Sequence, residues 1–194
     1  MPCAVFFPTI SSEERLAKLA MPSGKKIAMV LDTDTYNEID DQFAVAYAIR
    51  RNDKIDLQAI TAAPFFNNRS TSPADGMEKS YNEILHLLKL LRHPSENFAF
   101  RGATSYLPDL DTPVDTPASR RIIELAQEAE KKGETLYVCG IGAITNIASA
   151  ILLAPGIIRT IVVVWLGGHP EYVPVSREFN LYQDVQAVNA VLNS

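Results

Sequence analysis

Short apolar runs recur along the chain, and a segment with helical periodicity separates most of them. Apolar runs without alternation are typical of strands buried on both faces, as in parallel sheets. The last run is also rich in β-branched residues, which favour strands. We therefore expect strands at residues 27–31, 57–63, 98–100, 136–141 and 161–166.

The segments between these runs predict helices. A short first helix is opened by Ser11, and further helices are expected at 40–51, 75–91, 117–132, 143–153 and 184–192. Apolar residues surround the 40–51 segment almost completely, so we expect that helix to be buried. The alternation of strand and helix predicts an α/β fold, a Rossmann-like open and mostly parallel sheet with helices on both faces. We expect residues 1–24 to form an N-terminal helical extension and residues 25–194 to form the α/β domain.

Composition excludes several classes of protein. The chain of 194 residues is 47% hydrophobic and 21% charged, whereas a disordered chain would have less apolar surface. Its 18 Lys and Arg against 23 Asp and Glu give a net charge of −5, so we expect no nucleic-acid partner. Cys3 and Cys139 have no metal-site or disulfide-framework spacing, and no apolar run is long enough for a bilayer. We expect a cytoplasmic protein with no membrane partner.

An acidic segment follows the first expected strand. Its five carboxylates fall within ten residues: Asp32, Asp34, Glu38, Asp40 and Asp41. Ligands of parallel sheets bind at the carboxyl ends of strands. Asp40 and Asp41 suit the start of the next helix, but this role leaves Asp32 and Asp34 unexplained. Close like charges require neutralisation, and oxygen-rich sites suit Ca²⁺ or Mg²⁺, so the pattern favours a metal site over a simple capped turn.

The same residues resemble a known family. The segment D-T-D-T-Y-N-E-I-D-D-Q-F-A, residues 32–44, resembles the N-terminal signature of the inosine–uridine-preferring nucleoside hydrolases. Three further motifs follow in the family's order and are similar to its G-P-L-T-N-I-A, M-G-G and E-F-N: residues 142–148, residues 165–168, and residues 178–180 with Asp184 beyond them. Residues 25–194 would then be the N-terminal portion of the family domain.

The resemblance implies an activity and a cofactor. Family members hydrolyse the N-glycosidic bond of ribonucleosides with a Ca²⁺-activated water. By position, Asp34 and Asp41 would be Ca²⁺ ligands, and Asp34 would also take the proton from the attacking water. Asp40 would bind the metal or a ribose hydroxyl, and Ile141 would be a ligand through its backbone carbonyl. The resemblance also implies a homodimer or a homotetramer.

The resemblance places further residues around the substrate. Glu178 and Asn180 would hold the ribose hydroxyls, and Leu166 would line the sugar pocket. A ribose-binding Asn is expected after the second strand, where Asn67 and Asn68 are both candidates, and a simple turn role is the alternative. Other residues have structural roles in this interpretation: Thr145 and Asn146 as caps of the following helix, and Trp165 as core or pocket wall.

The sequence departs from the family pattern in three ways. The turn between Asp34 and Asp40 is longer by two residues. The family's G-N before E-F-N is absent, with Tyr172 near that Asn position. Family members are also substantially longer, and their last third supplies a further Asp ligand and a His that helps the base leave.

Two other hypotheses fit parts of the sequence. In a haloacid dehalogenase-type phosphatase, Asp32 would be the nucleophile and Asp34 the acid, although Tyr36 stands where Thr or Val is expected. Alternatively, the chain is a non-catalytic, truncated protein that binds ribosides or Ca²⁺.

Overall fold

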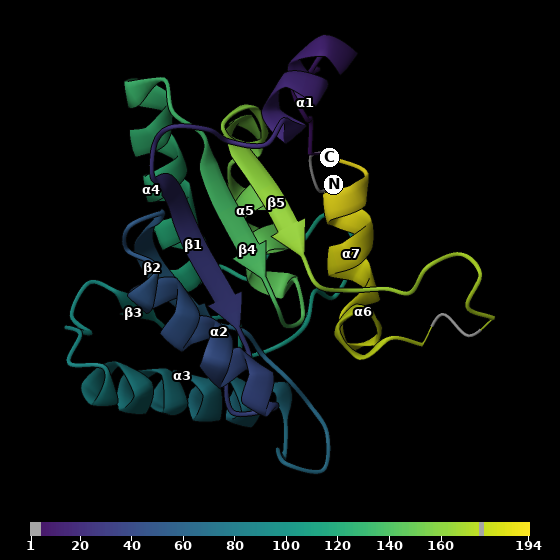
Figure 1. Cartoon of the computed structure of the whole chain (residues 1–194). Coiled ribbons are helices and arrows are strands. Elements are labelled where there is room, and N and C mark those ends of the chain that lie inside the picture. The colour runs from purple at the N-terminus through teal and green to yellow at the C-terminus, as the bar shows by residue number, and fades with distance from the viewer. Residues whose placement is uncertain (1–4, 175–176) are drawn as a thin grey trace.

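A single parallel sheet organises the molecule. The computed structural model describes residues 5–174 and 177–194. Within this part of the chain the sheet has the strand order β3-β2-β1-β4-β5, and every neighbouring pair is parallel (Figure 1). The strands are β1 (Ile27–Thr33), β2 (Ile55–Ala62), β3 (Ala99–Phe100), β4 (Leu136–Gly140) and β5 (Ile161–Trp165). The expected strands are confirmed, with ends shifted by up to two residues.

Helices cover both faces of the sheet, as expected. Met29 and Leu31 of β1 pack with one group of helices, α2 (Ile39–Arg50) and α3 (Pro73–Leu90). Val30, which points to the other face, packs with a second group: α4 (Pro117–Lys132), α5 (Thr145–Leu153) and α7 (Val185–Leu192). Because side chains alternate along a strand, one apolar run supplies both cores.

The chain reverses direction across the sheet between β1 and β4. From β1 it moves outward to β2 and β3, and α4 then carries it back to β4 on the other side of β1 (Figure 1). Such a reversal is a topological switch point, where the loops at the carboxyl ends of the two strands diverge and leave room for a ligand. The site of an α/β protein is therefore expected beyond the ends of β1 and β4.

Three features differ from the sequence expectations. The structure adds a short helix, α6 (Phe179–Gln183), and a 3-10 turn, η1 (Pro155–Arg159), which were not predicted. The expectation that the helix after β1 is buried all round is wrong, since Phe43 and Tyr47 of α2 are 70% and 62% exposed. One side of α2 packs on the sheet, through Val45 and Ala48, and its other side faces outward.

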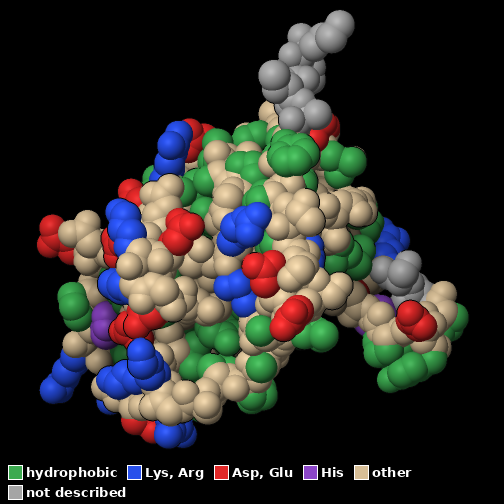
Figure 2. All heavy atoms as spheres, turned by 90° about the horizontal axis from the view of Figure 1, so that it is seen from above, with side chains coloured by type: hydrophobic (Ala, Val, Ile, Leu, Met, Phe, Trp, Pro, Cys, Tyr) green, Lys and Arg blue, Asp and Glu red, His purple; other side chains and the backbone are tan. Residues whose placement is uncertain are grey.

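The first helix, α1 (Ser12–Leu19), lies at the amino end of the sheet (Figure 1). Ser11 and Glu14 form a reciprocal capping box at its start, as the Ser and acidic residues there suggested. Seen from above in Figure 2, basic and acidic side chains are interspersed over the surface. Cys3 and the rest of residues 1–4 lie outside the described residues. Among the helices described, none combines the length and apolar character needed to cross a membrane.

Candidate functional site

Two buried carboxylates lie at the switch point. Asp34 directly follows β1, and Asp41 is in the first turn of α2; they are 1% and 5% exposed. The side chain of Asn37 donates to Oδ2 of Asp34 at 3.0 Å, and the hydroxyl of Thr33 donates to Oδ1 of Asp41. The backbone closes the turn, since the N–H of Asn37 donates to the carbonyl oxygen of Asp34 at 2.7 Å. Both side chains are thus held in place by neighbours in the same turn.

The two carboxylates are electrostatically unfavourable as they stand. The pKa of Asp41 is raised to about 7, mainly by burial and also by the charges of Asp40 and Glu38, against the hydrogen bond from Thr33. Burial also raises the pKa of Asp34 well above its usual value, and the charge of Asp41 adds to this effect. Paired buried acids of this kind are frequent in functional sites, because they bind protons or cations strongly.

Basic side chains near the turn bond to other groups. Arg69 donates from Nη1 to the carbonyl oxygen of Asn37 at 2.7 Å, and Lys79 donates to Asp75 and to the carbonyl oxygen of Arg69. Arg69 was not among the residues singled out from the sequence, whereas Asn37 was expected, as an extra residue of the turn, to bring new polar contacts. Asn37 stands in the lengthened turn, and this insertion was the available signal.

The loop after β4 lies directly against Asp34. A Cβ built on Gly142 would be 2.8 Å from Oδ1 of Asp34, closer than real Cβ atoms come, so only glycine allows this approach. The indole Nε1 of Trp165 donates to the carbonyl oxygen of Gly142 at 3.0 Å and supports the loop from β5. Ile141 lies beside Gly142, and its N–H donates to the carbonyl oxygen of Asp32 at 2.8 Å. Trp165 is therefore part of the wall of the site.

Glu178 and Asn180, at the start of α6, connect that helix to the loops after β4 and β5. Asn180 donates from Nδ2 to the carbonyl oxygens of Ile141, at 3.1 Å, and Leu166, at 2.9 Å. Glu178 caps α6 by accepting from the N–H groups of Asn180 and Leu181, and it also accepts from Gly168. The side chain of Leu166 is 59% exposed. The E-F-N segment and the loop after β4 are thus directly joined.

The two Asn candidates after β2 have different surroundings. Asn67 is half-buried and donates from Nδ2 to Oδ1 of Asn37 at 2.7 Å, which links it to Asp34 through Asn37. Its own Oδ1 accepts from the N–H of Arg69 at 2.9 Å. Asn68 is exposed. The sequence did not separate the two residues, whereas the structure connects Asn67 to the carboxylate cluster.

Two residues expected to cap α5 bond elsewhere. The cap residue of α5 is Ile144, with no side-chain cap bond. Thr145 donates to Oδ2 of Asp184 at 2.6 Å, and Asn146 donates to Oδ1 of Asp32 at 2.8 Å. The capping expectation for Thr145 and Asn146 is therefore wrong. Both side chains are fully buried, and buried polar groups bond to the partners that the tertiary fold supplies.

The donor set of the site consists of oxygens. Within residues 5–174 and 177–194, no three or more His, Cys, Asp or Glu side chains are grouped so that they could hold a metal. Asp40, at the start of α2, is exposed, unlike the two buried carboxylates. Two carboxylates, with nearby carbonyl and amide oxygens, fit a hard cation that completes its coordination with water or substrate oxygens. The buried like charges of Asp34 and Asp41 are the observation that favours such a cation.

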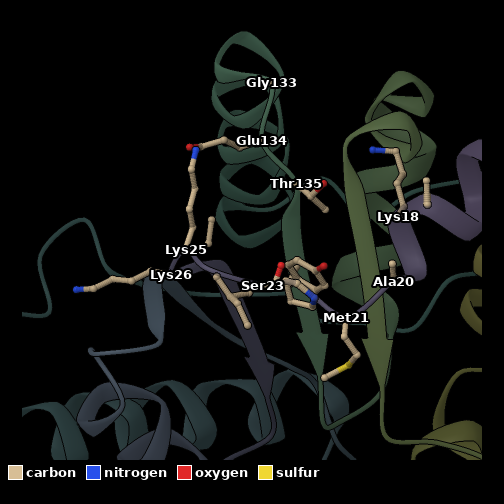
Figure 3. Close-up of a pocket in the computed structure, with 14 residues that line it drawn as sticks. Lys18, Ala20, Met21, Ser23, Lys25, Lys26, Gly133, Glu134 and Thr135 are labelled. Carbon is tan, nitrogen blue, oxygen red and sulfur yellow. The ribbon is translucent and has the colours of Figure 1, made fainter.

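Two hollows lie at opposite ends of the sheet strands. One of about 400 Å³ borders the turn and is lined by Tyr36, Gln42, Arg69 and Glu83. The other, of about 450 Å³, lies at the amino ends of β1 and β4, where Lys18, Lys25 and Lys26 contribute to its lining (Figure 3). Because the second hollow is at the opposite end of the strands from Asp34, it is not part of the carboxylate site.

Comparison with known proteins gives a family-level match. The family model described as inosine-uridine preferring nucleoside hydrolase matches residues 29–194. A curated relative, the inosine-uridine preferring nucleoside hydrolase of Leishmania major, is 36% identical over an alignment of 96 residues that covers 47% of this chain and 30% of the relative.

Solved structures show the same fold. A purine-preferring ribonucleoside hydrolase from Gardnerella vaginalis is similar with a TM-score of 0.66 and 24% identity, over 84% of this chain and 57% of that one. An inosine-guanosine nucleoside hydrolase has a TM-score of 0.67 and 21% identity, over 87% of this chain and 58% of that one. The chain thus spans less than two thirds of the length of each of these relatives.

Proposed function

Because the chain belongs to the inosine-uridine preferring nucleoside hydrolase family, we propose that it hydrolyses the N-glycosidic bond of ribonucleosides, giving ribose and the free base. The observation that carries the proposal is the pair of buried carboxylates, Asp34 and Asp41, at the switch point of the sheet. Their position inside the segment matched by the family supports the assignment of the reaction to this site.

The cofactor of the proposal is Ca²⁺. Asp34 and Asp41 would hold it with their carboxylates, Ile141 would contribute its backbone carbonyl, and Asp40 would bind the cation or a ribose hydroxyl. When bound, a divalent cation lowers the pKa of a coordinated water and so supplies a nucleophile near neutral pH. Only oxygen donors are proposed, which accords with the preference of Ca²⁺.

Asp34 is the proposed catalytic residue. Its carboxylate would lie beside a water bound to the cation and would take the proton from that water. Asn37, which donates to Oδ2 of Asp34, restricts the orientation of this carboxylate. The negative charges of Asp34 and Asp41 would also stabilise the positive charge that develops on the sugar as the bond breaks.

The remaining residues of the proposal hold the sugar. Asn67 is assigned to a ribose hydroxyl in preference to Asn68, because only Asn67 bonds to a residue of the carboxylate turn. Glu178 and Asn180 are assigned to the ribose through the polar atoms that their bonds within the protein leave available. Leu166 would contact the apolar side of the sugar. Holding the ribose in one orientation lowers the entropic part of the activation barrier, because the loss of freedom occurs when the substrate binds.

The proposal extends to the partners and the location of the protein. The substrate would be a small ribonucleoside, with no nucleic-acid partner and no membrane partner. A homodimer or homotetramer and a cytoplasmic location are proposed, as is the division into an extension, 1–24, and an α/β domain, 25–194. Sedimentation velocity of the purified chain tests the oligomeric state directly.

The proposal is tested by ribose release. The purified chain is incubated with inosine and with uridine after removal of divalent ions, then with CaCl₂ added back, and the reducing sugar is measured. We expect release that depends on Ca²⁺ and is lost in the Asp34→Asn variant. Full release in excess chelator would contradict the cation, and Ca²⁺ binding without any release would support the non-catalytic hypothesis instead.

The phosphatase hypothesis is not retained. The nucleophile of such an enzyme must reach the phosphorus atom of its substrate, but Asp32 is fully buried and its Oδ1 accepts bonds from Thr61 and Asn146. The family match also assigns the acidic segment to a different class of enzyme.

A further inference from the structure

Asp32 is a buried acidic side chain that the proposed reaction does not use. It is close to the carboxyl end of β1, paired in register with Thr61 of β2 and Gly140 of β4, and its side chain is fully buried. Its Oδ1 accepts from the hydroxyl of Thr61 at 2.6 Å and from Nδ2 of Asn146 at 2.8 Å. Its Oδ2 is buried with no hydrogen-bond partner. Such a group is costly in a protein interior, so its retention calls for a reason.

Asn146 extends this contact to the other strands. Besides Asp32, its Nδ2 donates to the carbonyl oxygen of Ala62 at 3.0 Å, and its Oδ1 accepts from the N–H of Ala103 at 2.8 Å. A Cβ on Gly102 would come within 2.6 Å of both polar atoms of the Asn146 side chain and 2.0 Å from the carbonyl oxygen of Ala62. The backbone beyond β3 is therefore tightly closed over the amide. One side chain links the ends of β1 and β2, the loop after β3 and the start of α5.

These links reach two of the proposed cation ligands, Asp34 and the backbone carbonyl of Ile141. Asp34 is two residues after Asp32 in the sequence. The carbonyl oxygen of Asp32 accepts from the N–H of Ile141 at 2.8 Å, and Asn146 is in the first turn of α5, the helix that follows the Ile141 loop. Asp34 and the Ile141 loop therefore extend from the same buried junction. A displacement of this junction would change the distance between the two proposed ligands.

We infer that Asp32 and Asn146 are positioning residues: their buried pair holds the ends of β1 and β2 and the start of α5 so that Asp34 and the carbonyl of Ile141 face one cation. The inference rests on the proposed function, because it assumes a cation at Asp34. Neither residue touches the cation or the substrate. Outer residues that orient metal ligands typically change metal affinity by about ten- to a hundredfold when they are replaced.

The experiment measures Ca²⁺ affinity by calorimetry in four variants of the whole 194-residue chain. Asn146→Ala removes the linking amide, and Thr61→Val removes a donor to Asp32 while preserving side-chain shape. Asp32→Asn preserves an oxygen that accepts both bonds but removes the charge. Ile84→Ala, in the fully buried part of α3, is the control for a general loss of stability. Terbium emission sensitised by Trp165, the one tryptophan of the sequence, provides a second readout at the site.

We expect Asn146→Ala to weaken Ca²⁺ binding about ten- to a hundredfold, and Thr61→Val to weaken it by a smaller factor. Asp32→Asn should retain affinity much closer to that of the unaltered chain, because the acceptor remains, and Ile84→Ala should lower the melting temperature without changing the affinity. If Asn146→Ala does not fold, Thr61→Val decides the question by itself.

Three outcomes would overturn the inference. Equal affinity in Asn146→Ala, Thr61→Val and the unaltered chain would show that the pair does not position the ligands. A loss in Asp32→Asn as large as that in Asn146→Ala would assign the effect to charge and not to position. No cation binding by the unaltered chain would overturn the metal part of the proposed function together with the inference. The first two outcomes, in contrast, would overturn the inference alone.

Discussion

Asn180 donates its side-chain amide to the carbonyl oxygen of Ile141 at 3.1 Å, across a separation of 39 positions in the sequence. The same amide nitrogen bonds to the carbonyl oxygen of Leu166 at 2.9 Å. The E-F-N segment is therefore in contact with the backbone group proposed as a cation ligand. This contact joins the part of the site that would hold the sugar to the part that would hold the metal.

Replacing Asn180 by Ala should destabilise the protein and impair the site. Two carbonyl oxygens lose their partner, and an unsatisfied buried polar group costs about 1–3 kcal/mol. We expect a loss of unfolding free energy in that range, measured by urea denaturation, together with slower ribose release. Asn189→Ala, at an exposed position of α7, is the control and should change neither quantity. An Asn180→Ala protein as stable and as active as the unaltered chain would contradict the assignment.

Asp34→Asn tests the proposed base. Loss of a general base typically slows a reaction by about a hundred- to ten-thousandfold, and loss of a ligand should also remove the stabilisation by Ca²⁺. Ribose release and the melting temperature with and without CaCl₂ measure the two effects. Glu130→Gln is the control, since Glu130 is exposed on α4, which does not carry the acidic turn. Unchanged Ca²⁺ stabilisation in Asp34→Asn would place the cation elsewhere.

Gly142→Ala should disturb Asp34 through a single methyl group. The added Cβ would be 2.8 Å from Oδ1 of Asp34 and 3.1 Å from the Cβ of Ala63, so the carboxylate or the loop must move. A small displacement of reacting groups can slow catalysis on the order of a hundredfold. We expect such a loss in ribose release and weaker Ca²⁺ binding. Gly156→Ala is the matched control, because its Cβ would meet no atom within 4 Å and should leave both measurements unchanged.

Asn67→Ala should weaken ribonucleoside use more than stability. The change removes the bond to Asn37 and the proposed contact with ribose, and we expect kcat/KM to fall by about ten- to a hundredfold, which corresponds to about 1.4–2.8 kcal/mol. Steady-state kinetics with inosine measures this effect. Asn82→Ala, on the exposed side of α3, serves as the control. A normal rate in Asn67→Ala with a slow Asn68→Ala would transfer the role to Asn68.

The stability of the metal-free protein should depend on pH in an unusual direction. Burial raises the pKa of Asp41 to about 7 and that of Asp32 to about 6, both from a usual value of 3.8. Between pH 3.8 and the raised pKa of each carboxyl, the folded protein therefore binds more protons than the unfolded chain. The unfolding free energy should therefore fall as the pH rises from about 4 to about 7, and then level off.

Urea denaturation at about pH 5 and about pH 8, with chelator and with CaCl₂, measures this dependence. A cation binds the ionised carboxylates, so Ca²⁺ should restore stability mainly at the higher pH. A metal-free protein that is more stable at about pH 8 than at about pH 5 would contradict the raised pKa values.

The sequence by itself determined the architecture and the position of the acidic turn. Runs such as Ile27–Leu31, without polar interruptions, require burial on both faces, and this requirement specifies a parallel sheet with two helical layers. Asp32 and Asp34 were singled out because close carboxylates at a strand end are unfavourable without a counter-charge, and the family resemblance then assigned the ligand roles to Asp34 and Asp41. These inferences depend on local sequence and on general physical rules, so they did not need the arrangement of distant segments.

The tertiary structure alone decided which polar side chains meet. Asn146 was expected to cap its helix, but one of its partners proved to be Asp32, 114 positions away in the sequence. In the same way, Asn67 was distinguished from Asn68 by its bond to Asn37, and Asn180 was joined to Ile141. A buried polar group bonds to whatever the packed chain brings within about 3 Å, and that neighbourhood is a property of the whole fold, which no local pattern encodes.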